Sequence, residues 1–369
     1  LALRQAGSAF KPFVYGAALE EGFALSQPVL DEPYVVAREA AKDWEPGNYS
    51  GEFRGPMSLR EALVRSQNVP VVRLGAALKG PGVGDFAARA GIPGVVPASP
   101  VAALGVTAVS PLEMTAAYAA FAAGGDRPAP RVVLRVEDGD GRVLLETRPH
   151  RQEVTDPAVA FLLTDVLRDV VDRGTGVGVR AVGYAGPAAG KTGTTDGATD
   201  VWFVGFTPRL VGTVWVGSDG VRPLPPRATG GTVAAPVWGR IFRAAAPGGV
   251  LPGPGGGAVA AWPAPPGGVV ELAIDRETGM ALAEGCGDLA PGADREYFLE
   301  GHEPEPVCPP RGVRGFLDRV GGFLGSLFGG DGEERPDIPG EPDPELGLPR
   351  IPERGSAAPE PGPVSSPPG

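Results

Sequence analysis

The stretch Ala189-Gly190-Lys191-Thr192-Gly193-Thr194-Thr195 stands just ahead of an apolar run from Val201 to Phe206. This arrangement predicts an edge strand that enters a sheet. Because the strand lacks bulky side chains, a substrate backbone can lie close against it. Lys191 adds a positive charge and the threonines add hydroxyls, so the strand is suited to pair with a peptide and hold its terminal carboxylate. Alone, Lys-Thr-Gly is a weak signal, because three common residue types occur in a row by chance.

A second pattern lies near the start of the chain, where Gly7-Ser8 predicts a helix start. Ser8 and Lys11 are then one turn apart on one face of the helix. A serine is a poor nucleophile until a base takes its proton, and a desolvated neutral lysine can be that base. The helix N-terminus also places backbone N–H groups where they can stabilise an oxyanion. The structural alternative is an N-cap serine followed by a solvated lysine.

A third pattern closes a short helix that begins with a capping box formed by Ser58 and Glu61. The helix is expected to end at Ser66-Gln67-Asn68, before Val69-Pro70 begins the next element. A serine hydroxyl and an asparagine amide at a helix end can face a cleft, where they relay protons or grip an amide. An ordinary polar helix terminus is the alternative.

Composition limits the classes of function. The chain has 369 residues, of which 42% are hydrophobic and 21% are charged, so it can build a core. Its net charge of -11 argues against nucleic-acid binding. No apolar stretch is long enough to span a membrane. Only His150 and His302 can serve as histidine bases or ligands, which disfavours a Ser-His-Asp triad and a histidine zinc site.

The remaining patterns indicate a folded body and a loose C-terminal third. A β-hairpin is expected over residues 131–146, an amphipathic helix over 157–171, a hairpin over 201–217, and a helix over 234–246 that packs on the sheet. Many of the 58 glycines and 43 prolines lie beyond residue 244. Cys286 and Cys308 flank a Gly/Pro-rich loop, which suits a disulfide in an exported protein, with two free thiols as the alternative.

Ser8-x-x-Lys11, Ser66-x-Asn68 and Lys191-Thr192-Gly193 occur in this order, a trio found in penicillin-binding proteins and class A β-lactamases. From residue 1 to residue 246 the sequence resembles the transpeptidase domain of class A penicillin-binding proteins, the bifunctional peptidoglycan synthases. The stretches RQAGSAFKPF, LREALVRSQN and AGKTGTTDGATDVWFVGFTP carry the resemblance. The region of Cys286 and Cys308 is similar to a C-terminal extension of some members.

This resemblance implies an α+β fold of the penicillin-binding/β-lactamase-like type, with an antiparallel sheet flanked by helices. The implied domains are a transpeptidase domain over 1–246, a Gly/Pro-rich extension with a small β module over 247–312, and a possible short helix with a disordered tail over 313–369. The family carries a glycosyltransferase domain and a membrane anchor upstream. Its sheet begins with strands that precede the nucleophile motif, so we expect missing upstream sequence, an incomplete sheet with an exposed edge and a fragment of doubtful activity.

The resemblance also implies a role for each motif residue. Ser8 is the acylated nucleophile and Lys11 its proton acceptor. Ser66 and Lys191 carry protons to the leaving amine, and Asn68 holds the acyl amide. Thr192 and Thr194 bind the terminal carboxylate within a substrate-binding strand that includes Gly193 and Thr195. The N–H groups of Ser8 and Thr194 form the oxyanion hole.

The implied reaction is acyl transfer from the D-Ala-D-Ala end of a peptidoglycan stem peptide to an amine acceptor, inhibited by β-lactams. It needs no metal or organic cofactor. The implied location is the extracytoplasmic face of the bacterial cell membrane, on the periplasm or cell-wall side. Three alternatives stay open: a β-lactamase or DD-carboxypeptidase that transfers the acyl group to water, a non-catalytic penicillin-binding sensor or scaffold, and coincidental motifs in an unrelated helical protein.

Overall fold

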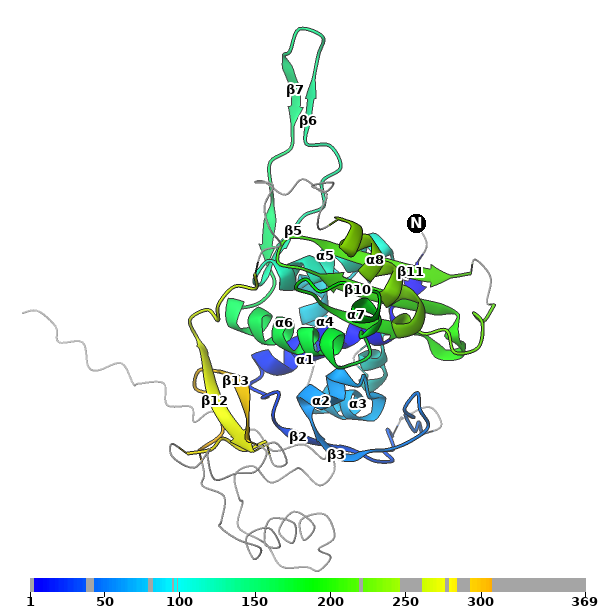
Figure 1. The fold of residues 1–369 in the computed structure, drawn as a ribbon, viewed down its shortest axis with the longest axis vertical. Coiled ribbons are helices and arrows are strands. Elements are labelled where there is room, and N and C mark those ends of the chain that lie inside the picture. The colour runs from blue at the N-terminus through cyan, green and yellow to red at the C-terminus, as the bar shows by residue number, and fades with distance from the viewer. Residues whose placement is uncertain are drawn as a thin grey trace, which may run out of the picture.

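The computed structural model describes residues 3–37, 43–78, 82–94, 96–97, 99–218, 222–245, 261–275, 279–283 and 293–306. Helices surround a sheet in the order β11-β10-β9, in which successive strands run antiparallel (Figure 1). Its strands are β9 (Ala189–Thr194), β10 (Asp200–Phe206) and β11 (Val211–Gly217). The predicted edge strand and the hairpin that follows it are therefore confirmed. In the described part of the chain no further strand pairs with β9 or β11.

The central strand β10 explains the apolar run in the sequence, because it is buried on both faces at every position. Its register sets Lys191 opposite Val204 and Gly193 opposite Trp202. The predicted C-terminal helix is α8 (Ala235–Ala245), which packs on β10 and β11. The indole of Trp238 on α8 donates to the Gly212 carbonyl of β11 at 3.0 Å, so a hydrogen bond as well as packing fixes helix to sheet.

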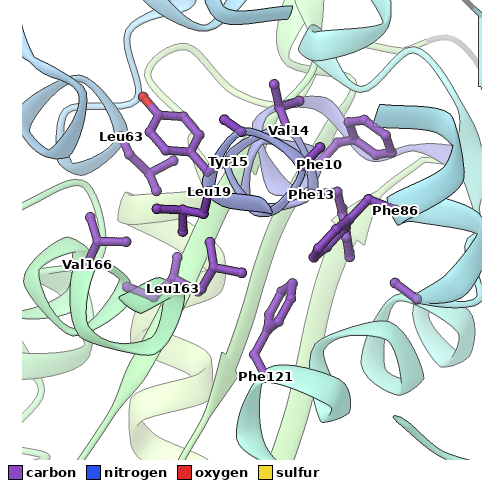
Figure 2. Close-up of a cluster of buried hydrophobic side chains, with 14 of the residues drawn as sticks. Phe10, Phe13, Val14, Tyr15, Leu19, Leu63, Phe86, Phe121, Leu163 and Val166 are labelled. Carbon is purple, nitrogen blue, oxygen red and sulfur yellow. The ribbon is translucent and has the colours of Figure 1, made fainter. Parts of the chain in front are cut away.

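The helix that carries the first motif runs through the middle of the core. The 3₁₀ helix η1 (Gly7–Phe10) leads directly into α1 (Lys11–Glu20), whose residues are buried from Lys11 to Leu19. Figure 2 shows α1 enclosed by apolar and aromatic side chains from other helices, among them Phe86, Phe121 and Leu163. Its low amphipathicity therefore reflects burial on all sides. Pro12 lies in the first turn, where a missing N–H is tolerated, as predicted.

The remaining helices cover this core. The stretch expected as one helix with a polar end is a helix followed by a tight turn, because Asn68 already begins the next helix. Only half of the predicted capping box forms: the Ser58 hydroxyl accepts from the Glu61 N–H, while the Glu61 carboxylate pairs with Arg65 and Arg173. The helices are α2 (Leu59–Val64), α3 (Asn68–Ala77), α4 (Gly82–Arg89), α5 (Pro111–Ala122), α6 (Pro157–Asp172) and α7 (Gly178–Ala181), with η2 (Pro100–Leu104), η3 (Asp196–Ala198) and the π-helical η4 (Gly230–Ala234).

In the described residues, five further strand pairs lie outside this sheet. The predicted hairpin of residues 131–146 forms, with a first strand shorter than expected, and it projects away from the body (Figure 1). The apolar side chains of this hairpin are exposed to solvent. The pairs are β1 (Arg4–Gln5) with β4 (Ala108–Val109), β2 (Pro28–Asp31) with β3 (Gly55–Ser58), β5 (Asp126–Pro128) with β8 (Arg151–Glu153), β6 (Arg135–Glu137) with β7 (Val143–Glu146), and β12 (Val269–Asp275) with β13 (Ala293–Leu299).

The C-terminal predictions are met in part within the described residues. The small β module is the pair β12–β13, which packs beside α6. Cys286, Cys308, the expected helix over 313–328 and the tail all lie outside the described residues. No helix of the described chain is both long and apolar enough to cross a membrane.

A buried charge cluster joins this module to the body. Arg60 on α2 makes a two-pronged contact with Glu296 of β13, at 2.6 and 2.7 Å. Its guanidinium also donates to Asp165 at 2.7 Å and to Asp169 at 2.9 Å, both on α6. The Glu296 side chain is 2% exposed. Because buried charges need partners, one arginine holds three carboxylates from two elements in place.

We expect Arg60→Met to lower the free energy of unfolding by about 3–5 kcal/mol, because three carboxylates would lose their shared cation. Chemical denaturation at pH 7 measures this loss. Arg135→Met is the matched control: Arg135 is about half exposed beside Glu137 on the projecting hairpin, and its loss should change stability by less than about 1 kcal/mol. Equal effects of the two substitutions would contradict a structural role for the cluster.

Candidate active site

The three sequence motifs converge on one serine hydroxyl. The Lys191 Nζ donates to Ser66 Oγ at 2.8 Å, and the Lys11 Nζ lies 3.5 Å from the same oxygen. Lys191 comes from β9, Lys11 from the first turn of α1 and Ser66 from the turn after α2. Residues more than a hundred positions apart therefore build a single cluster of two amines around one hydroxyl.

The Lys11 amine also faces three further oxygens. It lies 2.7 Å from the Ser66 carbonyl, 2.9 Å from the Gln67 carbonyl and 2.8 Å from the Asn68 Oδ1. Three acceptors match the three N–H groups of an ammonium, whereas a neutral amine has only two. The geometry around Lys11 is therefore arranged for the protonated form of the amine.

Burial opposes that protonation. Desolvation is the largest cause that lowers the pKa of Lys11 well below its usual value; the nearby charge of Lys191 lowers it further, and Asp31 raises it. Desolvation alone lowers the pKa of Lys191 to about 7. Both side chains are almost completely inaccessible to solvent. Two amines whose pKa values are lowered by burial are therefore available for proton transfer.

The backbone at Ser66 is held in an unusual conformation. Its φ of 59° lies in the left-handed region that residues with a side chain rarely adopt. This conformation turns the Ser66 carbonyl toward Lys11 while its hydroxyl contacts Lys191. Strain of this kind persists where the surroundings determine it, and here the two lysines hold both polar groups of the residue.

Ser8 lies half-buried in η1, against the end of β9. The preceding Gly7 has a φ of +53°, and a Cβ added there would lie 2.9 Å from the Thr194 carbonyl oxygen. The close approach requires glycine at this position. The Ser8 hydroxyl makes no hydrogen bond to any described residue, so the contact between Ser8 and Lys11 that the motif suggests is not formed here. Lys11 is instead turned toward Ser66, Gln67 and Asn68.

The threonines that follow Lys191 have distinct surroundings. The Thr192 hydroxyl bonds the Thr175 hydroxyl at 2.7 Å, and the Thr194 hydroxyl accepts from the Gly230 N–H at 3.1 Å. Thr195 serves local structure: its hydroxyl contacts Thr199 at 3.0 Å and accepts the Asp200 N–H at 3.0 Å. Thr192 and Thr194 therefore remain candidates for substrate contact, whereas the Thr195 hydroxyl is occupied in closing the turn before β10.

The packing around Gly193 explains why this position of β9 lacks a side chain. A Cβ at this position would lie 2.6 Å from the Ala6 carbonyl oxygen and 3.0 Å from the Trp202 Cβ. The missing side chain therefore allows the segment before Ser8 to pack against β9. Close approach of this chain to itself therefore already requires a glycine here, and the role of Gly193 in substrate binding stays a prediction.

Sequence reasoning assigned no role to Thr175, although the stretch DRGTGVGVR that contains it also resembles the family. Besides its bond to Thr192, its backbone N–H donates to the Val64 carbonyl at 3.2 Å, two residues before Ser66. The loop of Thr175 therefore bridges the element that carries Ser66 and the strand that carries Lys191. A hydroxyl flanked by Gly174 and Gly176 is the signal that could have marked it.

The chain belongs to the family described as the penicillin binding protein transpeptidase domain, which matches residues 3–243. This family, together with the α+β fold described above, confirms the resemblance stated from the motifs. Residues 265–310 match a second family, the C-terminal domain of penicillin-binding protein 1A. Both family descriptions name penicillin-binding proteins, so the body and the C-terminal extension point to the same class of protein.

Relatives of known name agree with this family. Penicillin-binding protein 1A from Neisseria cinerea is 38% identical over 259 residues, covering 67% of this chain and 32% of the relative. Penicillin-binding protein 1A from Pseudomonas aeruginosa is 33% identical, covering 84% of this chain and 42% of the relative. The chain thus spans about a third to two-fifths of the length of these two relatives.

Solved structures resemble the fold. The crystal structure of penicillin-binding protein 1A from Haemophilus influenzae has a TM-score of 0.73 and 27% identity, covering 83% of this chain and 49% of that chain. The PonA1 protein from Mycobacterium tuberculosis, solved in complex with penicillin V, has a TM-score of 0.61 and 28% identity. That similarity covers 72% of this chain and 73% of PonA1.

The burial of Lys191 predicts how stability depends on pH. Above a pH of about 7 the folded Lys191 is neutral, whereas the unfolded chain keeps its proton up to the ordinary pKa of 10.5. The unfolded state then binds more protons, so rising pH stabilises the wild type in this window, by about 1.4 kcal/mol per pH unit. Lys191→Met lacks this dependence, and it also removes a positive charge that faces Lys11.

We therefore expect the wild type to gain stability relative to Lys191→Met between pH 7 and pH 9, and the difference to level off below pH 7. Denaturant titrations of both proteins across this range measure it. A stability difference that does not change with pH would mean that Lys191 keeps its proton in the folded state.

Proposed function

We propose that this chain is a serine-type DD-transpeptidase that forms an acyl-enzyme on the D-Ala-D-Ala end of peptidoglycan stem peptides and is acylated by β-lactams. The observation that carries the proposal is the pair of buried lysines on one serine hydroxyl, with Ser8 one helical turn before Lys11. Membership of the transpeptidase family and the likeness to PonA1, solved with penicillin V, support it.

In the acylation step the Ser8 hydroxyl oxygen attacks the carbonyl carbon of the penultimate D-Ala. A carbon–oxygen bond forms, and Lys11 accepts the hydroxyl proton. The three oxygens around Lys11 then hold the new ammonium, so the acceptors needed after transfer are in place beforehand. The Ser8 hydroxyl must first turn toward Lys11, as happens in many sites when substrate binds.

The tetrahedral intermediate collapses when the carbon–nitrogen bond breaks and the terminal D-Ala leaves. Its amine takes a proton from Ser66, which recovers one from Lys191 at 2.8 Å. The backbone N–H groups of Ser8 and Thr194 are the proposed donors to the oxyanion, and Asn68 is the proposed partner of the acyl amide. Ser66 serves as the relay because one hydroxyl lies within reach of both amines.

The substrate carboxylate is assigned to the hydroxyls of Thr192 and Thr194, beside the charge of Lys191. Thr175 holds the Thr192 hydroxyl at 2.7 Å, which limits the rotamers that it can adopt. Deacylation by the amine of a second stem peptide completes cross-linking. Attack by water instead gives the carboxypeptidase or β-lactamase alternative, which shares every earlier step. A non-catalytic sensor would share the acylation alone. The proposed place of action is the outer face of the bacterial cell membrane.

We expect a fluorescent penicillin to label the wild-type chain covalently, and Ser8→Ala to abolish the labelling because the acylated oxygen is gone. Ser356→Ala is the matched control, because Ser356 lies outside the three motifs and outside both family matches, and it should label like the wild type. Denaturing gel fluorescence reads the adduct. Labelling of Ser8→Ala, or no labelling of the wild type, would refute the proposal for this chain.

The fate of the acyl group is tested with a D-Ala-D-lactate ester donor and increasing concentrations of a D-amino acid acceptor. A transpeptidase forms the aminolysis product at the expense of hydrolysis as the acceptor concentration rises. Mass spectrometry of both products gives the ratio. Hydrolysis that no acceptor suppresses would favour the carboxypeptidase or β-lactamase alternative.

A further inference from the structure

The N-terminus of α3, which carries Asn68, is capped from a distant part of the chain. Its N-cap residue, Gln67, makes no side-chain capping bond. The Asn48 Oδ1 instead accepts the N–H of Asn68 at 2.8 Å and lies 3.4 Å from the N–H of Val69. The first N–H groups of a helix need such acceptors. A side chain twenty positions upstream therefore fixes the end of the helix at the candidate active site.

The same loop also orients the Asn68 side chain. The Asn68 Nδ2 donates to the Gly47 carbonyl at 2.8 Å, and its Oδ1 lies 2.8 Å from the Lys11 Nζ. A carbonyl oxygen can only accept, so the Gly47 carbonyl binds the Nδ2 end of the Asn68 amide. The Oδ1 end therefore faces Lys11. Residues 47 and 48 thus hold both the backbone and the side chain of Asn68.

The other end of the Asn48 amide contacts a buried carboxylate. The Asn48 Nδ2 donates to the Asp31 Oδ1 at 2.7 Å and to the Glu52 carbonyl at 3.0 Å. The second oxygen of Asp31 accepts the Arg54 N–H at 3.1 Å. Asp31, at the end of β2, is 0% exposed. Burying a carboxylate this deeply is costly unless nearby groups compensate its charge.

The charged groups that face this carboxylate come from different elements. Lys11 of α1 and Arg73 of α3 both interact with the Asp31 charge. Glu32 and Tyr34 also face Arg73, whose guanidinium lies 4.3 Å from the centre of the Tyr34 ring. On the lysine side, Lys191 of β9 is the other charge that faces Lys11. Asp31 is therefore a negative charge that acts on Lys11 in the opposite direction to Lys191.

We infer that Asp31 and Asn48 are positioning residues for acylation: Asn48 fixes the helix end that carries Asn68, and Asp31 supplies the buried negative charge that faces Lys11. This inference rests on the proposed function. Lys11 must become an ammonium when it takes the Ser8 proton, and a nearby carboxylate stabilises that product. The pathway Lys11, Asn68, Asn48 and Asp31 is continuous through hydrogen bonds of 2.7–2.8 Å.

Two substitutions separate the effect of the Asp31 charge from the effect of the Asn48 cap on α3. Asp31→Asn keeps the shape and removes the charge, so the proton affinity of the lysine pair falls. The rising limb of the acylation rate against pH then moves to lower pH, while the rate at the plateau falls because Lys11 is a weaker base.

Asn48→Ala keeps the Asp31 charge and removes the cap of α3, so acylation slows by about tenfold or more at every pH, with the rising limb in its wild-type position. Glu21→Gln is the control, because Glu21 is an exposed carboxylate at the end of the same helix as Lys11.

The experiment measures the second-order rate of acylation by a fluorescent penicillin from pH 5.5 to 9.5 for all four proteins. A shifted limb in Asp31→Asn and an unshifted one in Glu21→Gln support the inference. Superposable profiles of Asp31→Asn and the wild type overturn it, even when Ser8→Ala abolishes labelling and the proposed function stands. If Asp31→Asn does not fold, Asn48→Ala decides: a slowed rate in folded protein supports the inference, and a wild-type rate overturns it.

Discussion

Two buried amines that share one hydroxyl are the constraint on which the rest of this structure depends. Each lysine alone would keep its proton at neutral pH in water, and burial of both makes that proton costly. The protein accepts this cost and surrounds Lys11 with oxygens that suit an ammonium. Desolvation and acceptor geometry therefore act in opposite directions, and this opposition is what keeps a lysine ready to exchange a proton.

Holding this balance requires rigid supports from separate elements. The central helix α1 is enclosed by the core, β9 is paired along its length with a fully buried strand, and Ser66 is held in a strained conformation between them. Thr175 ties the turn near Ser66 to the lysine strand, while Asn48 ties the loop of β2 to the start of α3. The positions of the two lysines and of Ser66 thus depend on hydrogen bonds made by residues outside the three motifs.

Much of this could be predicted from the sequence where the signal is local. The continuous apolar run of β10, the Pro12 in the first turn of α1 and the amphipathic pattern of α6 are local signals that physical rules interpret directly. The convergence of Ser66, Asn68 and the two lysines followed from the order of three motifs. Their family supplied that expectation, because no spacing rule could bring positions 11, 66 and 191 together.

What escaped prediction is non-local. The capping of α3 by Asn48 and the contact of Thr175 with Thr192 join distant segments through single side chains, which leave no periodic trace. The pairing of β2 with β3 was hidden because its strands are short and lie in a loop-rich stretch. The direction of the Ser8 hydroxyl depends on one rotamer, and the packing of Gly193 against Ala6 joins segments that are distant in sequence. Sequence patterns predict helices and strands better than they predict such contacts between distant segments of one chain.

The arginine cluster under β13 has a consequence for how the molecule unfolds. Arg60 lies in the first turn of α2, the helix that ends near Ser66, and its partner Glu296 lies on the last strand pair described. Detachment of that strand pair would remove the closest carboxylate partner of the buried Arg60, so detachment and loosening of the turn at Ser66 are energetically coupled. The C-terminal strands therefore unfold in the same cooperative transition as the body that carries the two lysines.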